Sequence, residues 1–118
     1  MKNVEDIYPL SPLQEGMLFH SLKEPGSGAY FEQYYCRLNG NLDTALYRQA
    51  WQAVVDRHTV LRSAFLWEEL DQPLQVVRSE VTLDWVERDL GESSVRDIDR
   101  WLESYLDDDR SKMFDLSK

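Results

Sequence analysis

Two histidines and one cysteine have the most familiar catalytic chemistry in this sequence: His20, His58 and Cys36. Histidine can act as a general acid or base and cysteine as a nucleophile, but each needs a neighbouring partner. No pair of these residues has the spacing of zinc ligands, and the sequence has no glycine-rich phosphate loop. We therefore interpret both histidines as structural or surface residues and Cys36 as a core residue.

Arg62 is more informative, because it is a charged residue among apolar neighbours in the sequence. On a strand it would share one face with Ala64 and Leu66, where a guanidinium without a carboxylate partner is costly to desolvate. The acids nearest in sequence, Glu68 and Glu69, would lie at the far end of that strand. We therefore expect either a carboxylate partner from elsewhere or a side chain that reaches solvent past the strand edge.

The stretch from Asp43 to Trp67 must position Arg62. Asp43 is the predicted N-cap of a long amphipathic helix, and from Leu61 onward the pattern alternates as in a strand. Both faces of that strand carry apolar residues, so we expect it to be covered on both sides. The helix is expected to bury the residues that recur at helical spacing, which are Leu46, Tyr47, Ala50, Trp51, Val54 and His58.

Another helix is predicted over residues 12–23. Ser11 is its expected N-cap, Pro12 occupies the first helical position, and Gln14 completes a capping box. Gly16 lies inside this helix, where glycine costs about 1 kcal/mol relative to alanine. An interior glycine of this kind is expected to let another helix or a ligand approach closely.

The remaining elements complete a mixed α/β layout. Residues 8–10 should be extended, because Pro9 disfavours a helical residue before it. A last helix is predicted after Ser94 and should run toward residues 110–112. Strands are predicted over residues 30–38, 74–78 and 81–86, with 74–78 antiparallel to 61–68 in a hairpin. The expected fold class is α/β, with a mixed sheet and flanking helices.

Composition limits the function classes. The 118 residues form one domain at most, and the net charge of −9 disfavours binding to nucleic acids or anionic membranes. No apolar run is long enough to span a membrane, and no signal-peptide pattern opens the sequence. One cysteine allows no internal disulfide, which is compatible with a reducing, cytoplasmic location.

Two segments resemble the first two motifs of the condensation domains of nonribosomal peptide synthetases. Residues 11–20, Ser-Pro-Leu-Gln-Glu-Gly-Met-Leu-Phe-His, resemble the opening motif, here called the first motif. Residues 57–65, Arg-His-Thr-Val-Leu-Arg-Ser-Ala-Phe, resemble the second motif, usually Arg-His-x-x-Leu-Arg-Thr-x-Phe, with Ser63 in place of threonine. Residues 114–117, Phe-Asp-Leu-Ser, resemble the segment before the next core strand of that family. The first motif has Leu13 and Gly16 where alanine and arginine are most common.

The resemblance implies a chloramphenicol-acetyltransferase-like lobe, two of which form a V around a tunnel. Donor and acceptor peptidyl carrier proteins deliver phosphopantetheine arms from opposite sides, and the acceptor amine attacks the donor thioester. The domain itself would bind no cofactor. The family's reacting-site motif, His-His-x-x-x-Asp-Gly, does not occur in residues 1–118. We therefore expect this chain to be the front of the N-terminal lobe, to be inactive alone, and to self-associate through open strand edges.

The resemblance also implies roles for particular residues. Arg62 would form an ion pair with the aspartate of the reacting-site motif, and Arg57 would also support the active site. The helix of the first motif would line the acceptor side of the tunnel with Gln14, Gly16 and Met17. No catalytic residue and no metal ligand is expected within this chain.

Two alternatives remain open from the sequence. The chain could belong to a non-catalytic module that docks carrier proteins, or to an epimerisation or heterocyclisation domain of the same fold. The sequence that follows would separate them, because His-His-x-x-x-Asp-Gly supports condensation and paired aspartates support heterocyclisation. The absence of both would support a binding module.

Overall fold

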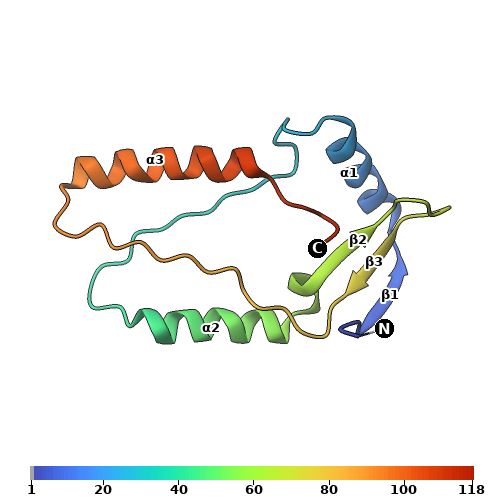
Figure 1. The fold of residues 1–118 in the computed structure, drawn as a ribbon, viewed down its shortest axis with the longest axis horizontal. Coiled ribbons are helices and arrows are strands. Elements are labelled where there is room, and N and C mark those ends of the chain that lie inside the picture. The colour runs from blue at the N-terminus through green and yellow to red at the C-terminus, as the bar shows by residue number, and fades with distance from the viewer. Residues whose placement is uncertain (1) are drawn as a thin grey trace.

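The protein is described here by a computed structural model that covers residues 2–118 (Figure 1). In chain order its elements are β1 (Asp6–Pro9), α1 (Pro12–Lys23), α2 (Thr44–Arg57), the 3-10 helix η1 (Thr59–Arg62), β2 (Ser63–Leu66), β3 (Leu74–Val77) and α3 (Val95–Lys112). The molecule is elongated, with extents of 55 × 31 × 20 Å. The sheet and α1 lie at one end, and α2 and α3 extend away from them (Figure 1). The predicted combination of helices and a sheet is confirmed.

The sheet has the strand order β1-β3-β2, and both pairings are antiparallel. The predicted hairpin is confirmed, since Ser63 pairs with Val77 and Leu66 with Leu74. The opening segment, expected only to be extended, adds the edge strand β1, in which Asp6 pairs with Val77. Within residues 2–118 the sheet is therefore antiparallel, and the expectation of a mixed sheet is wrong for this part of the chain.

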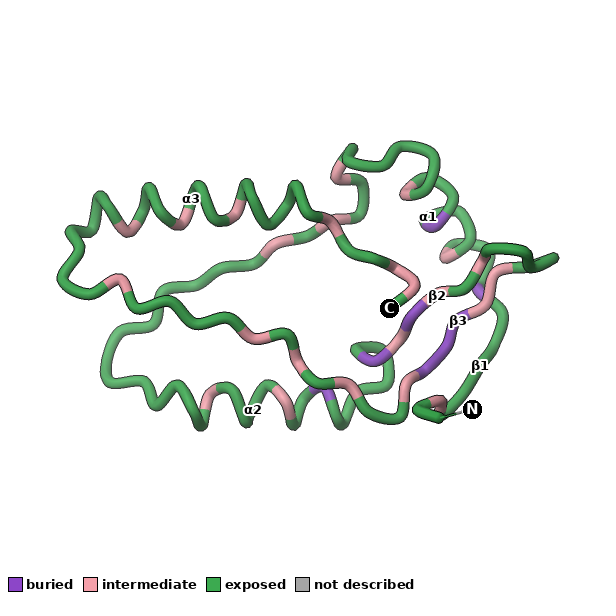
Figure 2. Tube along the Cα trace, viewed as in Figure 1, coloured by how far each residue is buried: buried purple, intermediate pink, exposed green. Residues whose placement is uncertain are grey.

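The buried core is small and lies around the sheet (Figure 2). β3 is the central strand, so its residues are covered most completely, with Val76 4% and Val77 2% exposed. Ala64 of β2 is 1% exposed, whereas Leu66 is 41% exposed, so β2 is covered fully at only part of its length. The other buried apolar residues are Leu10, Leu18 and Val55.

The helices begin as their predicted N-capping residues indicate. The Ser11 side chain accepts from the backbone N–H of Gln14, whose own side chain accepts from the backbone N–H of Ser11. Asp43 caps α2 through the backbone N–H of Leu46, and Ser94 caps α3 through that of Asp97. α3 continues to Lys112, as predicted because Asp107, Asp108 and Asp109 would oppose the helix dipole if the helix ended at them.

The predicted buried stripe of α2 is wrong. Leu46, Trp51 and Val54 are 61%, 45% and 38% exposed, and Val55 is the buried residue of this helix. α2 lies away from the sheet for most of its length, so its apolar face has few neighbours (Figure 1). Tyr47 is the exception, because its ring meets that of Trp85 with centroids 5.7 Å apart.

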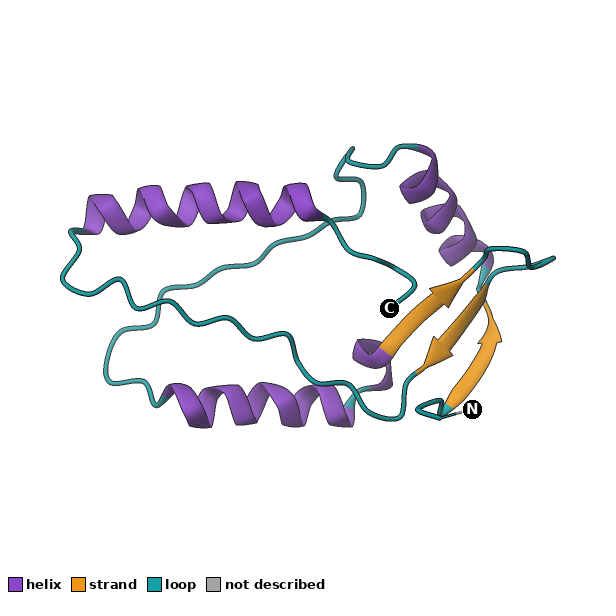
Figure 3. Cartoon of the chain, viewed as in Figure 1, coloured by secondary structure: helices purple, strands orange, loops and turns teal. Residues whose placement is uncertain are grey.

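Two of the predicted strands, over residues 30–38 and 81–86, are extended segments without strand partners (Figure 3). Side-chain hydrogen bonds connect these segments to the helices, in place of backbone hydrogen bonds to another strand. Gln33 Nε2 donates to the carbonyl of Leu106 in α3 at 2.9 Å. Gln52 of α2 donates to the carbonyl of Val81 and accepts from the N–H of Leu83, each at 2.8 Å. β propensity depends on a neighbouring strand, which these segments do not have within residues 2–118.

Two smaller corrections concern Cys36 and the residue at which β2 begins. Cys36, expected in the core, is exposed and free, because its segment has no packed sheet around it. The strand expected from Leu61 begins at Ser63, since residues 59–62 form the turn η1. Arg62 is therefore the last residue of a 3-10 turn and not an internal strand residue.

Candidate functional site

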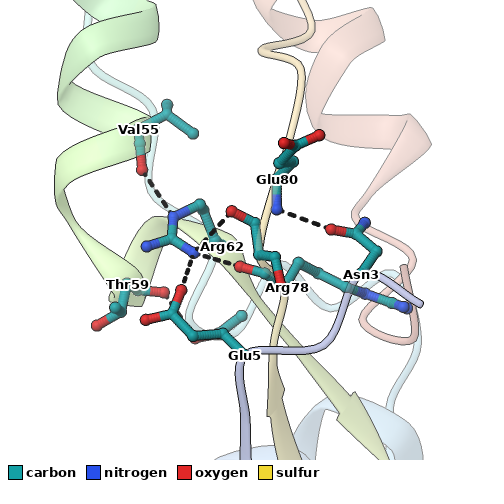
Figure 4. A network of polar contacts seen from close by, with 9 residues as sticks. Asn3, Glu5, Val55, Thr59, Arg62, Arg78 and Glu80 are labelled. Atoms are coloured by element: carbon teal, nitrogen blue, oxygen red, sulfur yellow. Dashed lines mark hydrogen bonds and ion pairs between the residues drawn. The ribbon is translucent and has the colours of Figure 1, made fainter. Parts of the chain in front are cut away.

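Arg62 lies buried where α2, β3 and the N-terminal segment meet (Figure 4). Its side chain is 6% exposed, so it does not reach solvent past the strand edge. Nη1 lies 2.7 Å from Glu5 Oε2 and 3.4 Å from the carbonyl oxygen of Ser79, and it also donates to the carbonyl of Arg78. Nε donates to the carbonyl of Val55 at 3.2 Å. One guanidinium thus joins three segments that are far apart in sequence.

Within this chain, Glu5 forms the ion pair with Arg62. The sequence predicts a carboxylate partner from outside the strand, and the family resemblance implies the aspartate of the reacting-site motif, but neither identifies Glu5. Glu5 stands one residue before β1, and its backbone N–H donates to Val77 at 2.8 Å. The Asn3 side chain also connects the N-terminal segment to the residues after β3, because it accepts from the backbone N–H of Glu80 at 2.7 Å. Recognition of β1 as a strand paired with β3 would have placed Glu5 beside Arg62.

The guanidinium retains a free donor group within the described chain. Arg62 uses Nε and Nη1 in all of its hydrogen bonds within residues 2–118, and none of them uses Nη2. A guanidinium can bind two carboxylates through different nitrogens. Glu5 therefore leaves capacity at Arg62 for a second acceptor.

Arg57 and the histidines lie outside this network. Arg57 ends α2, is exposed, and makes no side-chain hydrogen bond within residues 2–118. His58 caps the same helix through its backbone N–H, which donates to Val54 at 3.1 Å, and its ring is exposed. His20 is exposed and meets the ring of Phe19 with centroids 5.6 Å apart. The structure thus brings neither Arg57 nor a histidine to the Arg62 network.

Of the three predicted tunnel residues on α1, Gln14 and Met17 line the same cleft and Gly16 does not. Gln14 is half-buried and uses both ends of its amide, accepting from the N–H of Ser11 and donating to Gln75, each at 2.9 Å. Gly16 is exposed, and a methyl group built on it would meet nothing within 4 Å among residues 2–118. Met17 is 36% exposed and, together with Gln14, lines an apolar cleft of about 350 Å³ whose other lining residues are Leu10, Leu18, Ser21, Tyr30, Phe65 and Leu116. Close packing of another part of the described chain therefore does not account for Gly16.

A family model of the condensation domain matches residues 4–118. The chain belongs to the condensation-domain family of nonribosomal peptide synthetases. It is 42% identical over 117 residues to a linear gramicidin synthase of Brevibacillus parabrevis. It is also 42% identical over 115 residues to bacitracin synthase 3 of Bacillus licheniformis, and 40% identical over 113 residues to a plipastatin synthase of Bacillus subtilis.

These matches cover 99%, 98% and 96% of the chain, but only 2%, 2% and 4% of the three relatives. The matched part of the condensation domain contains both motifs found in the sequence. The first motif forms the N-cap and most of α1, and the second motif forms the end of α2, η1 and most of β2. Arg62, the most buried charged residue of the described chain, thus belongs to the second motif.

Neither a membrane span nor a metal centre is found in residues 2–118 of the condensation-domain chain. None of its helices combines the length and apolar character that crossing a bilayer requires. No group of three or more histidine, cysteine, aspartate or glutamate residues within this range could hold a metal ion.

The segment after α3 carries an aspartate with an altered pKa. Asp115 accepts hydrogen bonds from the Ser117 hydroxyl at 2.5 Å and from the Ser117 N–H at 3.1 Å, and Lys118 Nζ lies 2.9 Å away. The Ser117 hydroxyl is the largest cause, followed by Lys118 and the Ser117 backbone N–H, and these groups lower the pKa of Asp115 from 3.8 to about 2. The neighbouring carbonyl of Leu116 accepts from the N–H of Phe65 at 2.8 Å, so this segment lies beside β2.

We expect Asp115 to titrate with a midpoint near 2, as measured by NMR chemical shifts during acid titration. The folded-state pKa is lowered, so the stabilising contribution of this carboxylate is present above 3.8 and is lost as the pH falls toward 2. Ser117→Ala should move the midpoint back toward 3.8, because it removes the largest cause. Ser111→Ala is the control, since the Ser111 hydroxyl donates to the backbone carbonyl of Asp108 and not to a carboxylate. A midpoint of 3.8 in the unaltered chain would contradict this assignment.

Proposed function

We propose that this chain is part of a condensation domain that forms peptide bonds between carrier-bound thioesters. The amine of the acceptor aminoacyl group attacks the carbonyl carbon of the donor thioester. A new amide bond forms, and the carbon–sulfur bond to the donor phosphopantetheine thiol breaks. The match to the condensation domain over residues 4–118 carries this proposal. Arg62 of the second motif supports it. Its side chain is buried, and burial of a charge requires partners in a closely defined local structure.

We further propose that residues 1–118 are the front of the N-terminal lobe of a chloramphenicol-acetyltransferase-like fold. The reacting-site motif and the rest of the lobe would then lie elsewhere in a longer synthetase. Donor and acceptor peptidyl carrier proteins would be the partners, and their phosphopantetheine arms would deliver the substrates. In this arrangement the free Nη2 of Arg62 would bind the aspartate of the reacting-site motif, and Arg57 would support the same region. Self-association of the isolated chain remains a prediction.

The test is reconstitution of the synthetase module that contains this chain. The donor carrier is loaded with one aminoacyl group and the acceptor carrier with another, and the carriers are then analysed by mass spectrometry. We expect a dipeptidyl thioester on the acceptor carrier. A dehydrated ring product would support a heterocyclisation domain, inversion at the donor α-carbon an epimerisation domain, and carrier binding without any product a docking module. Each of these three results would contradict the proposed function.

Gly16→Leu is expected to slow use of the acceptor without lowering thermal stability. Leucine is the better helix former, and a Cβ atom at Gly16 would meet nothing within 4 Å among residues 2–118, so the melting temperature should stay equal or rise. If the exposed surface at Gly16 admits the acceptor arm, turnover should fall by about tenfold, or about 1.4 kcal/mol of activation free energy. Acceptor saturation curves and melting temperatures of the module measure both effects.

Gly16→Ala is the matched control for this prediction. It gives most of the helix-propensity gain but adds only one methyl group, so it should keep turnover close to that of the unaltered module. Equal turnover in the Gly16→Leu and Gly16→Ala variants would remove Gly16 from the substrate tunnel.

A further inference from the structure

A chain of four hydrogen bonds runs from the start of α1 across the sheet to η1. The backbone N–H of Ser11 donates to Gln14 Oε1 at 2.9 Å, and Gln14 Nε2 donates to Gln75 Oε1 at 2.9 Å. Gln75 Nε2 then donates to Ser63 Oγ at 2.9 Å, and the Ser63 hydroxyl donates to the carbonyl of Thr59 at 3.1 Å. We call these four bonds the relay. It begins in the first motif and ends in the second.

The direction of every bond in the relay is fixed by its two ends. A backbone N–H at Ser11 can only donate, and a backbone carbonyl at Thr59 can only accept. The amides of Gln14 and Gln75 must therefore both present oxygen toward Ser11 and nitrogen toward Ser63. The serine hydroxyl completes the relay because it accepts from one neighbour while donating to the next. Reversal of either amide would place two donors or two acceptors together.

Gln75 is the central member and the most deeply buried part of the relay. It lies in the middle strand β3, is 5% exposed, and pairs with Tyr8 on one side and Phe65 on the other. Glutamine is seldom buried to this extent, and a buried amide without partners destabilises a protein. An apolar residue of similar size would fill the same volume, so the hydrogen bonds and not the packing distinguish glutamine at this position.

We propose that Gln75 is a positioning residue that holds the first motif in fixed orientation to the second. Through Gln14 it fixes the first turn of α1, and Gln14 lines the apolar cleft together with Met17 of the following turn. Through Ser63 it fixes the carbonyl of Thr59, the first residue of the turn that ends at Arg62. No role for Gln75 was predicted from the sequence. Its effect on turnover rests on the proposed condensation reaction, whereas its effect on α1 does not.

The experiment compares Gln75→Met with Ser63→Ala and Ser63→Thr in the synthetase module that contains this chain. Methionine keeps the length of glutamine but forms neither bond, and threonine keeps the hydroxyl that alanine lacks. We expect Gln75→Met and Ser63→Ala to lower kcat by about tenfold, because small displacements of reacting groups slow catalysis, with little change in KM for the acceptor carrier. Ser63→Thr should keep kcat. The double variant Gln75→Met/Ser63→Ala should be no slower than Gln75→Met, because one relay is broken in both.

Two controls separate positioning from general destabilisation. Gln72→Met makes the same chemical change at an exposed residue before β3, and it should leave kcat unaltered. Val76→Ala removes buried volume beside Gln75 without touching the relay, so it should lower the melting temperature while kcat below that temperature is kept. Unaltered kcat in Gln75→Met, or a loss of kcat in Val76→Ala as large as that in Gln75→Met, would overturn the proposal.

Amide hydrogen exchange tests the relay independently of the reaction. Loss of the Gln75 amide should release Gln14, so the Ser11 amide and the first turn of α1 should exchange faster in Gln75→Met than in Val76→Ala. Equal exchange in these two variants would also overturn the proposal. A module that forms no peptide but shows the expected exchange pattern would contradict only the proposed function and would leave the relay established.

Discussion

Replacement of Arg62 by alanine is expected to lower the free energy of unfolding of the condensation domain by about 3–5 kcal/mol, because the proposed partner aspartate of the reacting-site motif would be left buried and unpaired. The substitution removes the donor that satisfies the Glu5 carboxylate and the carbonyls of Val55 and Ser79. Glu5 is 47% exposed and can be rehydrated, whereas the Arg62 side chain is 6% exposed and Val55 is buried, so the loss at these groups comes mainly from the carbonyl of Val55. Arg62→Lys should also impair the protein, because one ammonium group cannot reproduce the fork of the guanidinium. Both variants should have reduced turnover.

Arg37→Ala is the matched control for this effect. Arg37 also lies 2.7 Å from a carboxylate, that of Asp99, but the two side chains are 63% and 57% exposed. Exposed pairs contribute about 0–1 kcal/mol, so this substitution should change stability little. Urea unfolding and turnover of the synthetase module measure the comparison. If Arg62→Ala lost no more stability than Arg37→Ala and kept full turnover, Arg62 would have no structural role in the active site.

The isolated chain of residues 1–118 is expected to form no peptide bond, whereas the intact synthetase module should do so. General base or positioning work needs a group within hydrogen-bond reach of the attacking amine. The two histidines, His20 and His58, are both exposed. No side-chain hydrogen bond in the part of the chain described by the structure orients either ring. Incubation of the chain with loaded donor and acceptor carriers, followed by mass spectrometry, should give no dipeptide above the background without protein.

The intact module run in parallel shows that the loaded carriers are competent. Circular dichroism of the isolated chain shows whether its helices have formed, so that inactivity is not confused with unfolding. Dipeptide formation by residues 1–118 that disappeared in a His58→Ala variant would contradict this prediction. It would place a catalytic residue inside the second motif.

Local signals predicted the elements whose hydrogen bonds are formed locally. Ser11, Asp43 and Ser94 each satisfy a free N–H of the helix that follows, and this interaction depends only on residues three positions away. The β2–β3 hairpin was also predictable, because the turn at residues 70–73 brings its two strands together.

Features that depend on distant partners were not predictable in the same way. Residues 30–38 and 81–86 have the composition of strands, but composition does not specify whether another strand lies alongside. The pairing of β1 with β3 joins residues about seventy positions apart, and Glu5 reaches Arg62 only through that pairing. The need of Arg62 for a carboxylate could be argued from physical chemistry, whereas the identity of Glu5 required the three-dimensional arrangement.

Gln52 holds the extended segment at Leu83 by hydrogen bonds. This contact restricts which residues evolution or design can place at position 52. Its side-chain amide donates to one backbone group of the segment and accepts from another, so it replaces one peptide unit of a neighbouring strand. Glutamate lacks the donor, and asparagine has the same amide but is one methylene shorter. A leucine would pack against the segment but would leave its N–H and carbonyl without a partner from the protein. If every amino acid were placed at position 52 in turn, we therefore expect glutamine alone to keep both side-chain hydrogen bonds to this segment.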